Sequence, residues 1–172
     1  LGGYVKSYTD IANGKFLGIS WLIWIAILVA VITWFIFNMT RHGKYMYAIG
    51  GNPQAAEVAG VPVKLTLILI YMKAAAMYGL AGFMLGAKAG GASVNLGYGY
   101  EMEAIAACTI GGVSVTGGRG KVSSAIIGVA IFELLKVALQ YLGMNANAQY
   151  IAIGVVIFIA ISLDIRKYIA RK

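Results

Sequence analysis

The sequence predicts an all-α integral membrane protein with about five transmembrane helices, one of them interrupted by glycine. The first observation is an apolar run without a charged residue, LGISWLIWIAILVAVITWFIFNM at Leu17–Met39. At about 1.5 Å per residue this helix measures about 34 Å, which exceeds a hydrocarbon core of about 30 Å. The second observation is the composition, because 60% of the residues are hydrophobic and 12% are charged, against about 25% charged in soluble domains.

Four further apolar runs follow the first. The second is interrupted only by Lys73, and the third is broken by the glycine-rich GGRGK at Gly117–Lys121. The predicted spans are 17–39, 65–87, 102–116, 122–142 and 148–164. Residues 40–64 form a loop that holds both prolines, and the stretch up to Phe16 is expected to be a loop outside the membrane. Because the sequence opens without Met or a signal segment, we expect either a fragment or a subunit whose earlier spans lie elsewhere.

The distribution of Lys and Arg predicts the orientation. One side of the membrane receives nine of the 14 basic residues, and these are Arg41, Lys44, Lys64, Arg119, Lys121, Arg166, Lys167, Arg171 and Lys172. The other side receives three, Lys6, Lys15 and Lys88. The basic side is normally cytoplasmic, so we expect residues 40–64 and the C-terminus inside the cell. The net charge of +8 then reflects topology, and we expect no nucleic-acid partner.

The segment Tyr47–Val63, YAIGGNPQAAEVAGVPV, predicts a short helix between two spans. Asn52 suits the N-cap and Pro53 the first helical turn. Gly60 can end the helix in a left-handed conformation, and Pro62 prevents its continuation. Gly50-Gly51 is expected to supply the bend before it. Such a helix could dock in a groove of another protein, or the segment could be a simple linker.

The segment Gly97–Lys121, GYGYEMEAIAACTIGGVSVTGGRGK, is the second stretch of interest. Glu101 and Glu103 would occupy the first turn of a helix, where carboxylates interact favourably with the helix dipole. Gly111 and Gly112 fall in the middle of the predicted span. Glycine there permits either exposed backbone beside a transport pathway or tight helix packing, and the sequence alone leaves both open.

The charged side chains within the spans predict one ion pair. Glu133 and Lys136 are separated by three positions and can pair on one helix face.

The sequence lacks a phosphate-binding loop of the Walker type, a zinc-protease motif, a cysteine pair for a metal and a nucleophile elbow. We therefore expect neither ATP hydrolysis nor a directly bound metal or cofactor.

The two long motifs, YAIGGNPQAAEVAGVPV followed by GYGYEMEAIAACTIGGVSVTGGRG, resemble the C-terminal half of permeases of bacterial ABC-type monosaccharide importers. The resemblance covers nearly the whole chain, lies in the ribose, xylose and galactose branch, and is strongest to its galactose/methyl-galactoside members. It implies a multi-pass subunit of the inner membrane that translocates a monosaccharide. It also implies that the permease works as a homodimer, with a periplasmic sugar-binding protein outside and ABC ATPase subunits, which hold ATP and Mg²⁺, inside.

The resemblance also implies functional positions. The residues expected to couple to the ATPase are Gly50, Gly51, Asn52, Ala55, Ala56, Glu57 and Gly60. Those expected near the translocation pathway are Glu101, Glu103, Gly111 and Gly112. Three alternatives remain open at this point: an ion-coupled secondary transporter or channel fragment, an ABC permease for amino acids, and a fragment that is inert alone.

Overall fold

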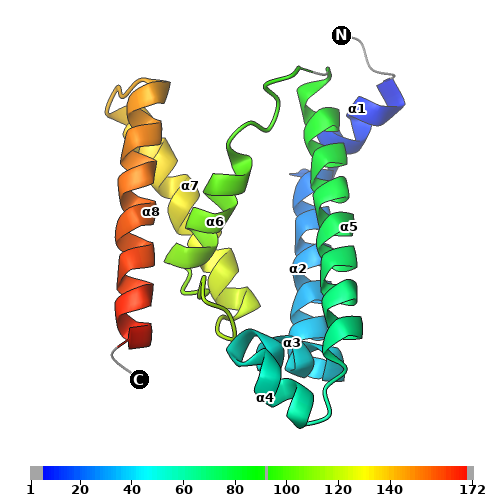
Figure 1. Ribbon diagram of the computed structural model, residues 1–172. Helices are drawn as coiled ribbons and strands as arrows, with labels where there is room; N and C mark the ends of the chain where they lie inside the picture. Colours follow the sequence, from blue (N-terminus) through cyan, green and yellow to red (C-terminus); the bar gives the residue numbers. More distant parts are fainter. Residues whose placement is uncertain (1–5, 92, 170–172) are drawn as a thin grey trace. The chain divides into compact units, whose positions relative to one another are not determined.

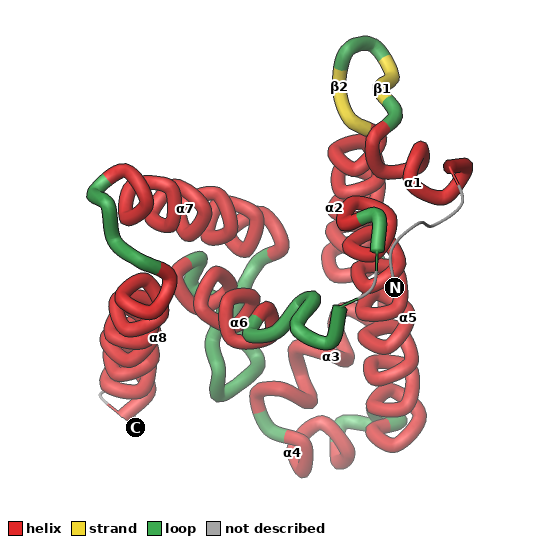
Figure 2. The backbone as a smooth tube through the Cα atoms, turned by 90° about the horizontal axis from the view of Figure 1, so that it is seen from above, coloured by secondary structure: helices red, strands yellow, loops and turns green. Residues whose placement is uncertain are grey.

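The structure is a computed structural model, which describes residues 6–91 and 93–169 (Figure 1). Its elements in chain order are α1 (Lys6–Asn13), β1 (Lys15–Phe16), β2 (Ile19–Ser20), α2 (Trp21–Met39), α3 (Arg41–Gly51), α4 (Pro53–Val58), α5 (Val63–Ala89), α6 (Tyr100–Ile110), α7 (Val122–Tyr141) and α8 (Ala146–Ile169). The predicted all-α membrane class is confirmed. The two short strands form a small antiparallel hairpin (Figure 2).

Three helices in the described part of the chain, α2, α5 and α7, are long and apolar enough to cross a membrane. Helix α8 contains a shorter apolar stretch, Asn147–Ser162. Helix α6 has 11 residues and therefore measures about 16 Å, roughly half the thickness of the hydrocarbon core. The total of five crossings stays a prediction.

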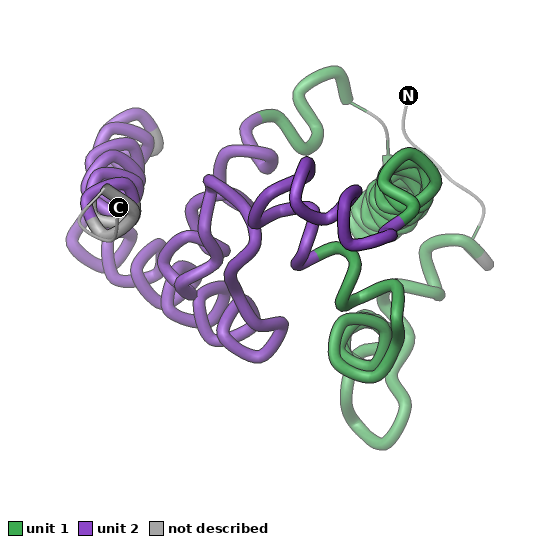
Figure 3. The backbone as a smooth tube through the Cα atoms, turned by 60° about the horizontal axis from the view of Figure 1, so that its bottom comes forward, with its two compact units in different colours: residues 1–46, 62–98 green, residues 47–61, 99–172 purple. Residues whose placement is uncertain are grey.

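The chain divides into two compact units, coloured separately in Figure 3. Unit 1 contains residues 1–46 and 62–98, and unit 2 contains residues 47–61 and 99–172. Unit 1 therefore holds α1, the hairpin, α2 and α5, whereas unit 2 holds α4, α6, α7 and α8. The two segments singled out from the sequence thus share unit 2 for most of their length.

Helix α1 of unit 1 corrects the expectation of a loop up to Phe16. The hydroxyl of Tyr8 donates a hydrogen bond of 2.6 Å to the carbonyl oxygen of Phe83 on α5, and the two rings meet edge to face at 4.9 Å. A Cβ atom on Gly86 would lie 2.6 Å from the Tyr8 hydroxyl, so this glycine makes room for it. Packing of this kind depends on long-range contacts, which local sequence patterns do not reveal.

The first membrane helix begins at Trp21, later than the predicted Leu17. Leu17 and Gly18 have φ angles of 53° and 79° and form the turn of the hairpin. Ser20 then caps the helix, since its hydroxyl accepts a hydrogen bond from the backbone N–H of Leu22. The apolar run therefore includes a turn and a strand in addition to the helix.

Unit 2 is built around α6, which packs on both α7 and α8. Its buried core joins the three helices and consists of Ala106, Ala107, Phe132 and Ile153. Small residues on α6 allow the neighbouring helices to approach closely, as is usual in membrane helix bundles. The core positions the loop 111–121, which connects α6 with α7.

Candidate functional site

The predicted short helix is present as α4. The side-chain Oδ1 of Asn52 accepts a hydrogen bond of 3.0 Å from the N–H of Ala55, and Pro53 occupies the first turn. Gly60 has a φ of 83°, a left-handed conformation that other residues adopt at a cost. Pro62 directly precedes α5. Local capping rules therefore explain both ends of α4.

Gly50 and Gly51 do not form the predicted bend. They are the last residues of α3, an 11-residue helix that sequence patterns did not predict. The chain turns instead at Asn52, whose φ of −159° and ψ of 106° are extended. Continued helical hydrogen bonding explains the difference, since the N–H of Asn52 still bonds to the carbonyl oxygen of Ala48 at 3.0 Å.

The end of α3 makes backbone contact with the loop 111–121. A Cβ atom on Gly50 would lie 2.5 Å from the backbone nitrogen of Gly118, and one on Gly118 would lie 2.7 Å from that of Gly51. Gly117 and Gly118 also have positive φ angles of 93° and 69°. Glycine is therefore required at position 50 for space, and at positions 117 and 118 for both space and conformation. We call this the glycine contact (Gly50, Gly51, Gly117 and Gly118).

A side-chain hydrogen bond supports the glycine contact. The hydroxyl of Tyr47 on α3 donates to the carbonyl oxygen of Gly120 at 2.8 Å. Sequence patterns did not single out Tyr47, because the only available signal was its position three residues before Gly50 on the same helix face. Together, the two contacts fix the loop 111–121 to the segment that carries α4.

Helix α4 presents two different faces. Ala56 is buried, with 4% of its surface exposed, whereas Val58 is 91% exposed. Gln54 and Glu57 are also exposed. An exposed apolar side chain beside polar ones on a short, capped helix is suited to contact with another protein.

The predicted pathway residues lie along α6 and do not form one cluster. Glu101 and Glu103 occupy its first turn, and Gly111 caps its other end. About 12 Å of helix separates Glu103 from Gly111. Their role in translocation stays a prediction.

Gly111 lies at a close crossing of α6 and α7. A Cβ atom there would clash with the carbonyl oxygen of Ser124, and one on Gly128 would clash with that of Ala107. This placement fits tight packing, one of the two possibilities for Gly111. Gly112, with a φ of 84°, turns the chain out of the helix.

Glu103 forms an ion pair that sequence spacing did not predict. Its Oε2 lies 2.7 Å from the Nζ of Lys136 on α7. The predicted pair of Lys136 with Glu133 is present at a longer distance of 3.7 Å. The first pair was missed because its members are 33 positions apart.

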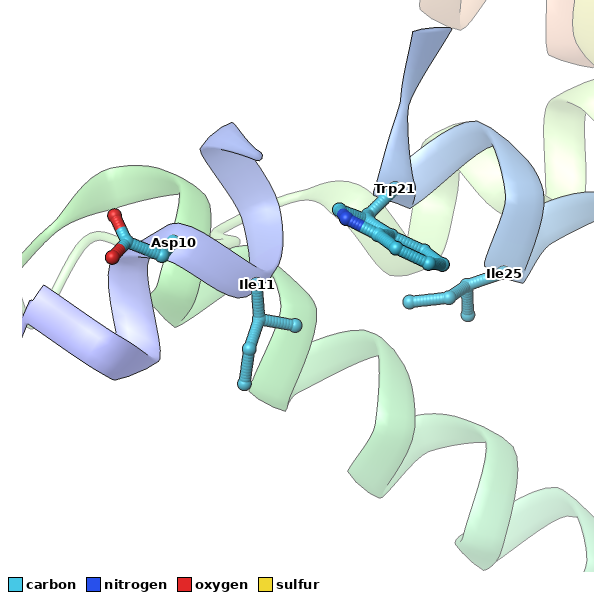
Figure 4. A pocket seen from close by; sticks show the side chains of 4 residues that line it. All are labelled: Asp10, Ile11, Trp21 and Ile25. Carbon is cyan, nitrogen blue, oxygen red and sulfur yellow. The ribbon is translucent and has the colours of Figure 1, made fainter. Parts of the chain in front are cut away.

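Two cavities lie in unit 1, away from the predicted functional residues. A cavity of about 290 Å³ is lined by Asp10, Ile11, Trp21 and Ile25, and in Figure 4 the carboxylate of Asp10 points away from the Trp21 ring. A second cavity, of about 230 Å³, lies between α2 and α5 and includes Lys73. Among the described residues, no group of three or more His, Cys, Asp or Glu side chains is arranged to hold a metal.

Comparison with known proteins agrees with the resemblance. The chain is 40% identical to the galactose/methyl galactoside import permease protein MglC of Haemophilus influenzae and 42% identical to that of Escherichia coli, over its whole length and 52% of theirs. It is 36% identical to the ribose import permease protein RbsC of Escherichia coli over 90% of the chain and 48% of that protein.

The chain thus spans about half the length of the curated relatives it matches. No solved structure matches it. Residues 3–161 match the family described as the permease component of the branched-chain amino acid transport system. Together with the apolar helices of the fold, this match shows that the chain belongs to that family of transport permeases.

Proposed function

We propose that the chain is the membrane-spanning permease part of an ABC-type importer for a monosaccharide, with galactose or methyl galactoside as the first substrate to test. The relatives that are 40–42% identical are named as galactose/methyl galactoside import permeases. Sugar is favoured over amino acids because those names, and that of the ribose permease, all specify sugars.

The observation that carries this proposal is the two-faced helix α4 next to the glycine contact. A separate ATPase subunit, with ATP and Mg²⁺, would bind the exposed face around Val58 from the cytoplasm. A sugar-binding protein would deliver the sugar from the periplasmic side, and a second copy of the permease would complete the pathway. The chain would then lie in the bacterial inner membrane with its C-terminus in the cytoplasm.

The contacts of unit 2 suggest how the motion is transmitted. ATP binding closes the ATPase pair and displaces α4. The glycine contact and the Tyr47 hydrogen bond pass this displacement to the loop 111–121, and hence to α6 and α7. A stiff connection is needed to transmit force, and the cap at Asn52 together with Pro53 and Pro62 supplies it. The sugar itself would be bound weakly, so that release remains fast.

Uptake of radiolabelled galactose by cells that express the complete transporter tests the proposal. Uptake is expected to survive a protonophore and to stop when ATP is depleted. Val58→Asp is expected to abolish uptake and association with the ATPase while membrane insertion continues, because it replaces the exposed apolar side chain of α4 with a charge. Ala56→Asp and Gly60→Pro are expected to abolish uptake by disrupting α4 itself.

Two results would contradict the proposal. Uptake that stops with the protonophore but survives ATP depletion would indicate an ion-coupled carrier. Normal uptake in Val58→Asp and Gly60→Pro would remove α4 from the mechanism.

A further inference from the structure

Three charged side chains meet where α6 and α7 pack together. The Nζ of Lys136 lies 2.7 Å from Oε2 of Glu103 on α6 and 3.7 Å from Oε1 of Glu133 on its own helix. The side chains of Lys136 and Glu103 are 21% and 19% exposed, whereas that of Glu133 is 59% exposed. One ammonium therefore lies between two carboxylates and is closer to the less exposed one.

The surroundings of Lys136 make an unpaired charge costly. It lies five residues before the end of α7, about 7 Å along the helix axis, and its Nζ is 5.9 Å from the centre of the Phe132 ring. An ammonium in such an apolar setting is strongly disfavoured without a counter-ion. If α6 moved away from α7, Glu103 would no longer contact Lys136. The Lys136 ammonium would then have no counter-ion unless another carboxylate took the place of Glu103.

We propose that Glu133 is that replacement, a second counter-ion that pairs with Lys136 when α6 and α7 separate. Residues three positions apart share a helix face, so the existing pair at 3.7 Å can shorten by rotation of side chains alone. This inference rests on the proposed transport function and adds to it that α6 and α7 separate during transport.

The Glu103 carboxylate, which loses its contact with Lys136 in this exchange, is also stabilised. Glu103 lies in the first turn of α6, where the free N–H groups and the helix dipole stabilise a negative charge. The exchange therefore leaves neither charge uncompensated. Lys136 and Glu133 act as positioning residues that lower the cost of separating the two helices.

Distance measurements between spin labels test this exchange in the complete transporter in lipid nanodiscs. Labels at Met102→Cys on α6 and Leu134→Cys on α7, both exposed positions, are introduced in a Cys108→Ser background. The measured quantity is the ratio of separated to paired populations during ATP turnover. Glu133→Gln is expected to lower this ratio about tenfold, because Lys136 then separates without a partner.

Three further variants complete the test. Glu103→Gln is expected to raise the ratio, since Lys136 then pairs with Glu133. Glu133→Asp keeps the charge, and its ratio is expected to be close to that of the unmodified protein and well above that of Glu133→Gln. Gln140→Ala removes an exposed polar side chain from α7 and is expected to leave the ratio unchanged.

The proposal is overturned if Glu133→Gln leaves the ratio within about twofold of the unmodified protein, or if Glu133→Asp behaves as Glu133→Gln does. Either result leaves the proposed function standing if galactose uptake by the unmodified transporter still depends on ATP. Loss of that ATP dependence would instead reject the proposed function, whatever the distances show.

Discussion

The hydroxyl of Tyr47 donates a hydrogen bond of 2.8 Å to the carbonyl oxygen of Gly120, a residue 73 positions away. This bond and the glycine contact join the segment that carries α4 to the loop that follows α6. Helices α6 and α7 are therefore linked to α4 through the end of α3 and the loop 111–121, and residues 47–61 and 99–172 belong to one compact unit. This connection is the structural basis of the proposed coupling.

Removing the Tyr47 hydroxyl tests the hydrogen bond. Tyr47→Phe is expected to lower the free energy of unfolding by about 1 kcal/mol, the usual value of one such bond, and to speed amide hydrogen exchange in the loop 111–121. Detergent titration and exchange mass spectrometry measure the two effects. Tyr45→Phe, on the same helix, serves as the control and is expected to change the stability by less than about 0.5 kcal/mol. Equal effects of the two variants would argue against the bond.

Adding one methyl group tests the glycine contact. Gly50→Ala places a Cβ atom 2.5 Å from the nitrogen of Gly118, so the backbones must move apart, and we expect a loss of about 1–3 kcal/mol. Gly51→Ala meets no atom within 4 Å and is expected to leave the free energy of unfolding unchanged or to raise it slightly through better helix propensity. Unfolding of the purified variants measures the difference, and similar losses for both would contradict the close approach of the two backbones.

Exchanging the cap of α4 tests whether the helix must be rigid. Asn52→Ala removes the acceptor for the Ala55 N–H and is expected to cost about 1 kcal/mol. It should also reduce uptake, because a frayed α4 transmits less motion. Asn52→Asp keeps an acceptor and is expected to preserve the helix. Hydrogen exchange of the Ala55 amide reports the cap directly, and slow exchange in Asn52→Ala would show that the cap is dispensable.

His42 is expected to make stability depend on pH. Its Nε2 is buried and has no hydrogen-bond partner within the described part of the chain. Burial, with a smaller contribution from the positive charge of Lys73, lowers the pKa of His42. The folded protein therefore binds this proton less readily than the unfolded chain does. The free energy of unfolding is at its maximum above the ordinary histidine pKa of about 6.5 and falls as the pH decreases through the lowered pKa of His42.

Imidazole NMR can follow this titration, because His42 is the only histidine in the sequence. Lys73→Met is expected to raise the pKa of His42 without restoring its ordinary value, since burial remains. A pKa at or above the ordinary value of about 6.5 in the unmodified protein would contradict the buried placement.

Local features of the sequence were sufficient to predict α4. An N-cap at Asn52, a proline after it and a left-handed glycine at position 60 act within a few residues, so their effect can be read from sequence. The long apolar helices were predicted for the same reason, although the turn at Gly18 shortened the first one.

Contacts between distant residues could not be predicted in this way. Nothing in the sequence pairs Tyr47 with Gly120 or Glu103 with Lys136, because the members of each pair are far apart in the chain and meet only in the folded structure. Helix α1 was not predicted, and the packing of its Tyr8 beside Gly86 on α5 is a contact that the sequence does not reveal. Spacing did predict Glu133 with Lys136, but the closer partner came from another helix.

The side of the membrane on which α4 lies tests the central claim most directly. Val58→Cys in a Cys108→Ser background places one reactive thiol on the exposed face of α4. A maleimide that cannot cross membranes is expected to label it in inside-out vesicles and not in intact spheroplasts, and bound ATPase should protect it. Labelling in intact spheroplasts would place α4 outside the cell and contradict the proposed docking partner, energy source and direction of transport.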